Sequence, residues 1–123
     1  MVRNAAGWSL LAHTLLGLGS EWRDENPYRK DKKPVYEEAI RIGSSAYNQN
    51  CTRCHGLEAV SGGTAPDLRK LPIDKETDEY FQQSVHSGKV RNGNVYMPPF
   101  GGVLSREAVW AIRCYLDTRH TND

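Results

Sequence analysis

The chain has 123 residues, a formal net charge of +1 and a mean hydropathy of −0.66. This length is enough for one small domain and too short for two. The near-neutral charge lacks the basic excess of nucleic-acid-binding proteins, so no nucleic-acid partner is expected.

Residues 1–20 have the outline of a secretory signal peptide. Arg3 gives a positive start, residues 5–16 are mostly apolar, and residues 17–20 are mostly small, as before a cleavage point. The apolar run is too short to span a bilayer comfortably, so we expect no stable membrane span. An N-terminal helix that packs on the domain is the alternative interpretation. A cleaved signal would place the mature protein in the periplasm.

Residues 21–33 are polar and charged, which predicts a linker. One domain is then expected over residues 34–119, followed by a polar tail at 120–123. The first helix of this domain is predicted from Val35 to about Asn48, because apolar or small residues recur there at helical spacing. They are Val35, Ala39, Ile42 or Gly43, Ala46 and Tyr47.

Two further helices follow in the predicted domain. Asp74 is a good N-cap for a helix that runs to about Ser87, and Gly88 can end it. Ser105 can cap the last helix, from residue 106 to about 118. Their predicted buried faces are Tyr80, Phe81 and Val85 in the former, and Ala108, Trp110 or Ala111, Ile112, Cys114 or Tyr115, and Leu116 in the latter.

The segments between these helices are long and irregular. Residues 56–72 and 88–104 are rich in glycine, serine and proline, and no strand pattern is evident in them. The fold class expected is therefore all-α, with three to four helices and long loops. Loops of this length are uncommon in a compact domain unless they wrap around something, which favours a bound cofactor.

Residues 51–55 carry the chemistry of the sequence. Cys51-Thr52-Arg53-Cys54-His55 is a C-x-x-C-H motif, which is typical of covalent attachment of a c-type haem. On one helical turn the two thiols can add to two vinyl groups of one porphyrin, while His55 directs a ring nitrogen at the iron. A redox dithiol would require a βαβ context, and a zinc site would require a second ligand pair. Neither is evident in the sequence.

The third cysteine lies far from this motif. Cys114 falls on the predicted last helix, and the odd cysteine count is explained if the haem uses the other two sulfurs. We expect Cys114 to be a buried, inert thiol.

Pro66 is the expected partner of the histidine. A metal-bound histidine needs a hydrogen bond at its second ring nitrogen, which orients the ring and sets its basicity. The Pro66 carbonyl lies about ten residues downstream of the motif, where it can accept this bond.

Met97 is the expected second ligand of the iron. Besides Met1 it is the only methionine, and it stands before a proline pair in a glycine-flanked loop. Thioether ligation would raise the reduction potential and leave no open coordination position. Three histidines remain as alternatives for this position, namely His13, His86 and His120.

With these elements in place, the sequence resembles the class I cytochromes c over about residues 34–118. In that family a glycine and an aromatic residue precede the haem cysteines, and the first and last helices cross at the glycine. The crossing involves a Tyr-Leu pair. The matching residues are Gly43, Tyr47 and Cys51, Tyr115 and Leu116 with Ile112 against Gly43, Pro66 with Leu68, and Met97 with Pro98. The resemblance implies the class I cytochrome c fold around one haem.

Two strings give a finer resemblance. NQNCTRCHGLEAVSGGTAPDLR and GNVYMPPFGGVLS are similar to the soluble cytochromes that accept electrons from quinoprotein (PQQ-dependent) alcohol dehydrogenases. This implies an electron carrier rather than an enzyme, with a periplasmic dehydrogenase as donor and a terminal oxidase or another cytochrome as acceptor. The alternatives are a haem c subunit, or a small haem enzyme or ligand sensor with an open or displaceable sixth position.

Further residues are expected near the haem. Leu68, Phe100, Trp110 and Tyr47 could wall it, and simple core packing is the role expected first for each of them. Five cations lie near the haem-binding segments and could surround the exposed haem edge, namely Arg53, Arg69, Lys70, Lys89 and Arg91.

Overall fold

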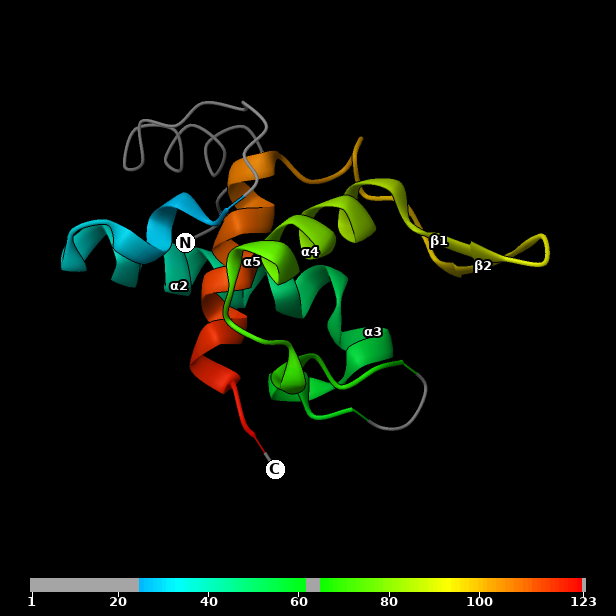
Figure 1. The fold of residues 1–123 in the computed structure, drawn as a ribbon, viewed down its shortest axis with the longest axis horizontal. Helices are drawn as coiled ribbons and strands as arrows, with labels where there is room; N and C mark the ends of the chain where they lie inside the picture. The colour runs from blue at the N-terminus through cyan, green and yellow to red at the C-terminus, as the bar shows by residue number, and fades with distance from the viewer. Residues whose placement is uncertain (1–24, 62–64, 123) are drawn as a thin grey trace.

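The structure is a computed structural model that describes residues 25–61 and 65–122, so the predicted signal peptide lies outside the described residues. Helices α2 (Lys33–Asn50), α4 (Lys75–Ser87) and α5 (Arg106–Arg119) form the body, and the short α3 (Thr52–His55) follows α2 (Figure 1). The connections contain the 3-10 turns η1 (Pro27–Lys30), η2 (Leu57–Ala59) and η3 (Leu68–Lys70), and strands β1 (Lys89–Arg91) and β2 (Asn94–Met97). The mostly helical fold and its three main helices are confirmed.

Helices α2 and α5 cross in close contact at Gly43. A Cβ atom at this position would lie 1.9 Å from the carbonyl oxygen of Ala111 and 2.9 Å from the amide nitrogen of Ile112. Only glycine leaves room for the two backbones to approach so closely. The predicted crossing of Gly43 against Ile112 is therefore confirmed.

Helix α5 is the centre of the core, because every residue from Glu107 to Leu116 is buried. Its two sides belong to different apolar clusters. One cluster contains Val109, Ile112, Tyr115 and Leu116 of α5 together with Tyr47, Cys51, Phe81 and Val85. The other contains Trp110, Ala111 and Cys114 together with Tyr28, Ala39 and Ile42.

The segment before α2 differs from the linker predicted over residues 21–33. Tyr28 is completely buried, and the Asn26 side chain donates to the Trp110 carbonyl at 3.3 Å and to Cys114 Sγ at 3.2 Å. The prediction failed for this part of the segment because the polar groups of Asn26 and Arg29 are bound inside the protein rather than by water. Residues 26–29 are therefore part of the domain.

A buried ion network joins this segment to α4 and α5. The Asp78 carboxylate accepts two hydrogen bonds from Arg29, at 2.7 and 2.9 Å, and one from Arg113 Nε at 2.6 Å. Burial alone would raise the pKa of Asp78, but the bonds from Arg29, the Asn26 amide and Arg113 hold it below its usual range. Arg29 also contacts Asp117 at 2.8 Å, so two arginines face two carboxylates.

The two strands were not predicted. They form an antiparallel hairpin through Asn92 and Gly93, which both have positive φ, at 51° and 81°. Such a pair is required by the tight two-residue turn, and Asn-Gly is its usual sequence. A second difference lies on α4, where Tyr80 is 55% exposed instead of buried. Its ring lies under the Lys89 ammonium, 4.3 Å from the ring centroid, beside the hairpin.

Candidate haem site

The C-x-x-C-H segment forms one tight turn at the end of α2. Cys51 is the residue between α2 and α3, and its carbonyl accepts from the amides of Cys54 and His55 at 3.2 and 2.9 Å. Both cysteines and the histidine therefore lie on one helical turn. Cys51 and His55 are buried, whereas Cys54 is exposed.

The end of this turn is fixed by Tyr47 and Gly56. The Tyr47 hydroxyl donates to the Gly56 carbonyl at 2.7 Å, and Gly56 has a φ of 86°. A Cβ on Gly56 would lie 1.9 Å from the Val60 carbonyl oxygen, so glycine is required here. The aromatic residue that precedes the motif thus holds the histidine turn in place.

The hydrogen bond expected between His55 and Pro66 is present. Nδ1 of His55 lies 3.1 Å from the Pro66 carbonyl oxygen, which can only accept, so Nδ1 carries the proton. Burial lowers the pKa of His55, although this bond opposes the shift. The ring is therefore neutral, with the Nε2 lone pair available to a metal ion.

The thiol chemistry disfavours a redox dithiol. Burial, and then the neighbouring Cys54, raise the pKa of Cys51 to about 12, whereas a catalytic dithiol needs a lowered thiol pKa. Burial likewise raises the pKa of Cys114 to about 12, and this thiol is completely buried, as predicted. Within the described ranges, no group of three or more His, Cys, Asp or Glu side chains could hold a metal ion.

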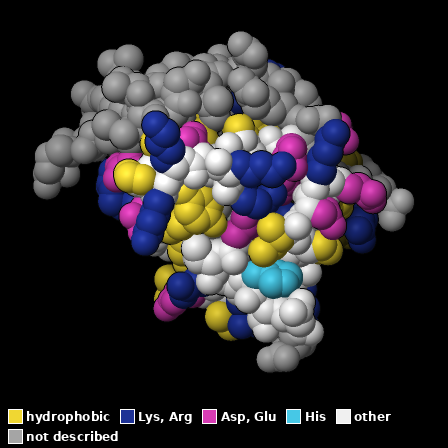
Figure 2. Space-filling model, turned by 60° about the vertical axis from the view of Figure 1, so that its left-hand side comes forward, with side chains coloured by type: hydrophobic (Ala, Val, Ile, Leu, Met, Phe, Trp, Pro, Cys, Tyr) yellow, Lys and Arg dark blue, Asp and Glu magenta, His cyan; other side chains and the backbone are white. Residues whose placement is uncertain are grey.

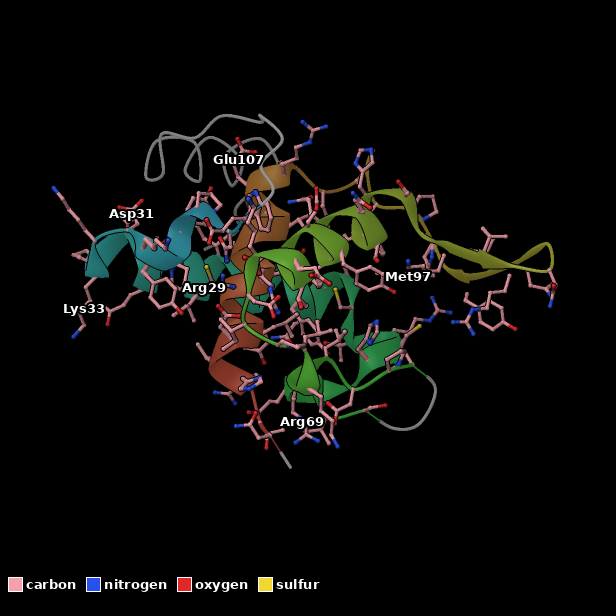
Figure 3. All side chains as sticks on the ribbon, viewed as in Figure 1. Arg29, Asp31, Lys33, Arg69, Met97 and Glu107 are labelled. Atoms are coloured by element: carbon pink, nitrogen blue, oxygen red, sulfur yellow. The ribbon has the colours of Figure 1, made fainter. Side chains whose placement is uncertain are left out.

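Met97 is the last residue of β2 and lies where the hairpin joins the helical body (Figure 3). Its loop is docked on the end of α4, because the Phe100 amide donates to the Val85 carbonyl at 2.8 Å. The Met97 carbonyl lies against Gly88, where a Cβ would be only 2.5 Å from its oxygen. The position of Met97 is therefore set by the C-terminal end of α4.

Met97 is brought to the same apolar cluster as Cys51. It is half-buried there, together with the predicted residues Leu68 and Phe100 and two that sequence reasoning missed, Leu71 and Leu104. Trp110, in contrast, belongs to the cluster on the other side of α5, which is the core-packing role expected for it. The α5 periodicity alone could not assign Trp110 to a side, because both sides of this helix are buried.

The residues after the histidine turn leave apolar surface uncovered. Leu57 is 71% and Val60 is 52% exposed, immediately beyond His55. Neighbouring exposed apolar side chains form the kind of surface that a ligand or partner covers. An imidazole, a thioether sulfur, two thiols and this uncovered surface fit the donor set and the large apolar ring of a haem.

The remaining candidates take other places. His86 is exposed and lies against Gly101, His120 contacts Asn122 beyond α5, and His13 lies outside the described residues. Arg69 is paired with Asp67 at 2.9 Å, whereas Lys89 and Arg91 each lie over a tyrosine ring. Arg53 and Lys70 are exposed.

Comparison with known proteins identifies the family. The family model described as cytochrome c oxidase, cbb3-type, subunit III matches residues 38–116. The chain is also 56% identical over 106 residues to cytochrome c550 of Pseudomonas aeruginosa, covering 86% of this chain and 72% of that protein. The chain belongs to the cytochrome c family. This cytochrome c has the class I fold, carries a covalently bound haem c, and is an electron-transfer protein rather than an enzyme.

Larger relatives contain a similar segment. The cytochrome c is 40% identical over 81 residues to the quinohemoprotein alcohol dehydrogenase ADH-IIG of Pseudomonas putida, covering 66% of this chain and 11% of that enzyme. It is 37% identical over 86 residues to ADH IIB of the same species, covering 70% and 12%. No solved structure matches the cytochrome c significantly. Among the described helices, none has both the length and the apolar character that a membrane span requires.

Proposed function

We propose that this cytochrome c is a periplasmic electron carrier whose haem iron is ligated by His55 and Met97. The observation that carries the proposal is that Met97 packs against the same cluster as Cys51, although the two are far apart in the sequence. A bound haem supplies a one-electron redox couple. With His55 and Met97 both holding its iron, the haem would exchange electrons and would offer no free position to a substrate.

The chain's own residues keep this site fixed during electron transfer. Pro66 holds the His55 ring in one orientation, and α4 holds the Met97 loop from the other direction. Leu68, Phe100 and Leu104 supply apolar surface that excludes water. A site that moves little between the two oxidation states needs little reorganisation, which suits rapid electron exchange.

The ligand assignment is tested with Met97→Ala. We expect a lower reduction potential, loss of the weak methionine-to-iron absorption band in the ferric near-infrared, and ready binding of carbon monoxide by the ferrous protein. Leu104→Ala is the matched control, because it removes apolar contact from the same cluster without removing a ligand. An unchanged Met97→Ala spectrum would refute the assignment, and ready carbon monoxide binding by the wild type would favour a haem enzyme or sensor.

We further propose that the electrons come from a quinoprotein alcohol dehydrogenase and pass to a terminal oxidase or another cytochrome. Support comes from the similarity to segments of two such dehydrogenases and from the family model's description as an oxidase subunit. Stopped-flow mixing of the ferric protein with a purified, substrate-reduced dehydrogenase tests the donor. A rate no faster than with the same enzyme lacking its substrate would exclude it.

The same family model also favours a second candidate, a haem c subunit held in an oxidase complex. The two candidates differ in their assembly. The signal-like residues 1–20 predict export to the periplasm. A carrier would be recovered there alone, whereas a subunit would co-elute with oxidase activity during gel filtration.

A further inference from the structure

The hairpin of β1 and β2 projects away from the helical body (Figure 1). Val90 and Val95 are cross-strand partners, and each is 63% exposed. Cross-strand partners project from the same face of a sheet, so the two valines form one apolar surface. Tyr96, which follows Val95 and therefore projects from the other face, is 64% exposed. These side chains contribute little to the core, so their apolar surface is available to something outside it.

The hairpin lies in a stretch of chain with cations and no carboxylates. No aspartate or glutamate occurs between Glu79 and Glu107, although the whole chain has 15 acidic residues against 16 lysines and arginines. Lys89 lies 4.3 Å from the centroid of the Tyr80 ring, and Arg91 lies 5.5 Å from that of Tyr96. On the face shown in Figure 2, by contrast, basic and acidic side chains are interspersed. The hairpin is thus complementary to an acidic surface.

The position of the hairpin connects it to the metal site. Met97 is the last residue of β2 and pairs with Lys89. At roughly 3.3 Å per residue, Val95 lies about 7 Å along the strand from Met97. A protein bound to the hairpin would therefore sit beside the proposed axial ligand. Brief redox encounters use small interfaces that combine apolar and charged contacts. The hairpin offers both, with the valine pair on one face and Arg91 on the other.

We propose that the hairpin is the docking element for a redox protein with an acidic surface, with Val90 and Val95 as its apolar face and Lys89 and Arg91 as the cations that attract the partner. This inference rests on the proposed carrier function and adds the surface that the carrier uses. Removal of the Lys89 and Arg91 charges should slow association at low salt, because opposite charges steer the encounter. Removal of the apolar pair should weaken the encounter complex at every ionic strength.

The test uses Lys89→Gln/Arg91→Gln and Val90→Ser/Val95→Ser in the haem-loaded protein. Two controls match them. Lys33→Gln removes an exposed cation at the opposite end of the molecule (Figure 3), and Ile73→Ser removes a half-exposed apolar side chain at the far end of α4, about 20 Å away. The measurements are reduction by a substrate-reduced quinoprotein alcohol dehydrogenase and oxidation by a cbb3-type oxidase, both by stopped flow over a range of salt concentrations.

We expect the charge variant to react roughly tenfold more slowly at low salt and to lose most of its salt dependence. The valine variant should react several-fold more slowly at all salt concentrations, and both controls should match the wild type. Reduction by ascorbate at high salt and the reduction potential should be unchanged in every variant. An altered ascorbate reduction rate or reduction potential in the valine variant would mean that these side chains wall the haem instead. That result would overturn the proposal.

Three other outcomes would also overturn it. These are wild-type rates in both hairpin variants, a concentration-dependent dimer that Val90→Ser/Val95→Ser abolishes, and hairpin-dependent binding to anionic lipid vesicles without any effect on the protein partners. Failure of the carrier function is recognised separately. In that case the wild type itself exchanges electrons with neither the dehydrogenase nor the oxidase.

Discussion

On one side of α5 the chain buries its polar groups against partners of its own, whereas on the other side it leaves apolar groups partly uncovered. Asp78 is fully enclosed by Arg29 and Arg113 in the first region. In the second, Met97 is half-buried against the cluster that contains Cys51, and Leu57 is exposed just beyond His55. The first region is complete without a cofactor, and the second has the surface that a haem would cover. Stability and haem binding should therefore be separable by substitution.

The largest effect is expected from Asp78→Asn. It leaves the buried Arg113 and the partly buried Arg29 without their shared carboxylate, and breaking a buried ion pair costs about 3–5 kcal/mol. Guanidinium unfolding should show this loss while the haem spectrum stays unchanged. Glu38→Gln is the control, since it breaks an exposed pair with Arg41 on one helix and should cost at most about 0.5 kcal/mol. A spectral change would show that the two regions are coupled.

The same carboxylate gives a pH dependence. The pKa of Asp78 is lower in the folded protein than its ordinary value of about 3.9. Its contribution to stability is therefore present above that value and is lost as the pH falls through the folded-state pKa. The difference in unfolding free energy between wild type and Asp78→Asn should shrink on going from pH 7 to pH 3. A constant difference would contradict this origin.

Gly43→Ala should come next, because it acts on the crossing that both regions share. The added methyl would lie 1.9 Å from the Ala111 carbonyl oxygen, so α2 and α5 must separate. Overpacking of this kind costs about 1–3 kcal/mol, and here the obstacle is backbone. Gly102→Ala is the control, since its Cβ would meet nothing within 4 Å. Equal unfolding midpoints for the two variants would show that the helices do not meet so closely.

Gly88→Ala tests the cofactor side alone. Gly88 has φ 75° and ψ −174°, a conformation that is essentially restricted to glycine, and an added Cβ would press on the Met97 carbonyl. We expect a loss of about 1–3 kcal/mol and easier binding of carbon monoxide by the ferrous protein. Gly93→Ala shares the positive φ but meets nothing within 4 Å, so it should leave carbon monoxide binding unchanged. Similar carbon monoxide binding in both variants would show that Gly88 does not hold Met97 in position.

The sequence predicted the contacts that depend on local spacing or on a chemical requirement. The turn of Cys51, Cys54 and His55, the Pro66 hydrogen bond and the Gly43 crossing are of this kind. It missed the burial of residues 26–29, because a polar segment does not show whether its partners are water or distant charges. The hairpin could have been predicted, because Asn92-Gly93 between Val90 and Val95 is a hairpin pattern. The glycine and proline content of residues 88–104 favoured an irregular loop instead.

The smallest effect is expected from Tyr47→Phe, at the boundary between the two regions. The change removes the hydrogen bond from the hydroxyl to the Gly56 carbonyl and keeps the ring against Tyr115, at a centroid distance of 5.3 Å. One buried hydrogen bond contributes about 1 kcal/mol, so the unfolding free energy should fall by that amount. Because Gly56 directly follows His55, the loss should be accompanied by a small change in the haem absorption spectrum. Tyr36→Phe, about three helical turns away toward the start of α2, is the control and should leave that spectrum unchanged, since Tyr36 packs against the Trp110 cluster. A stability loss without any spectral change would mean that Tyr47 supports the fold but does not position the histidine turn.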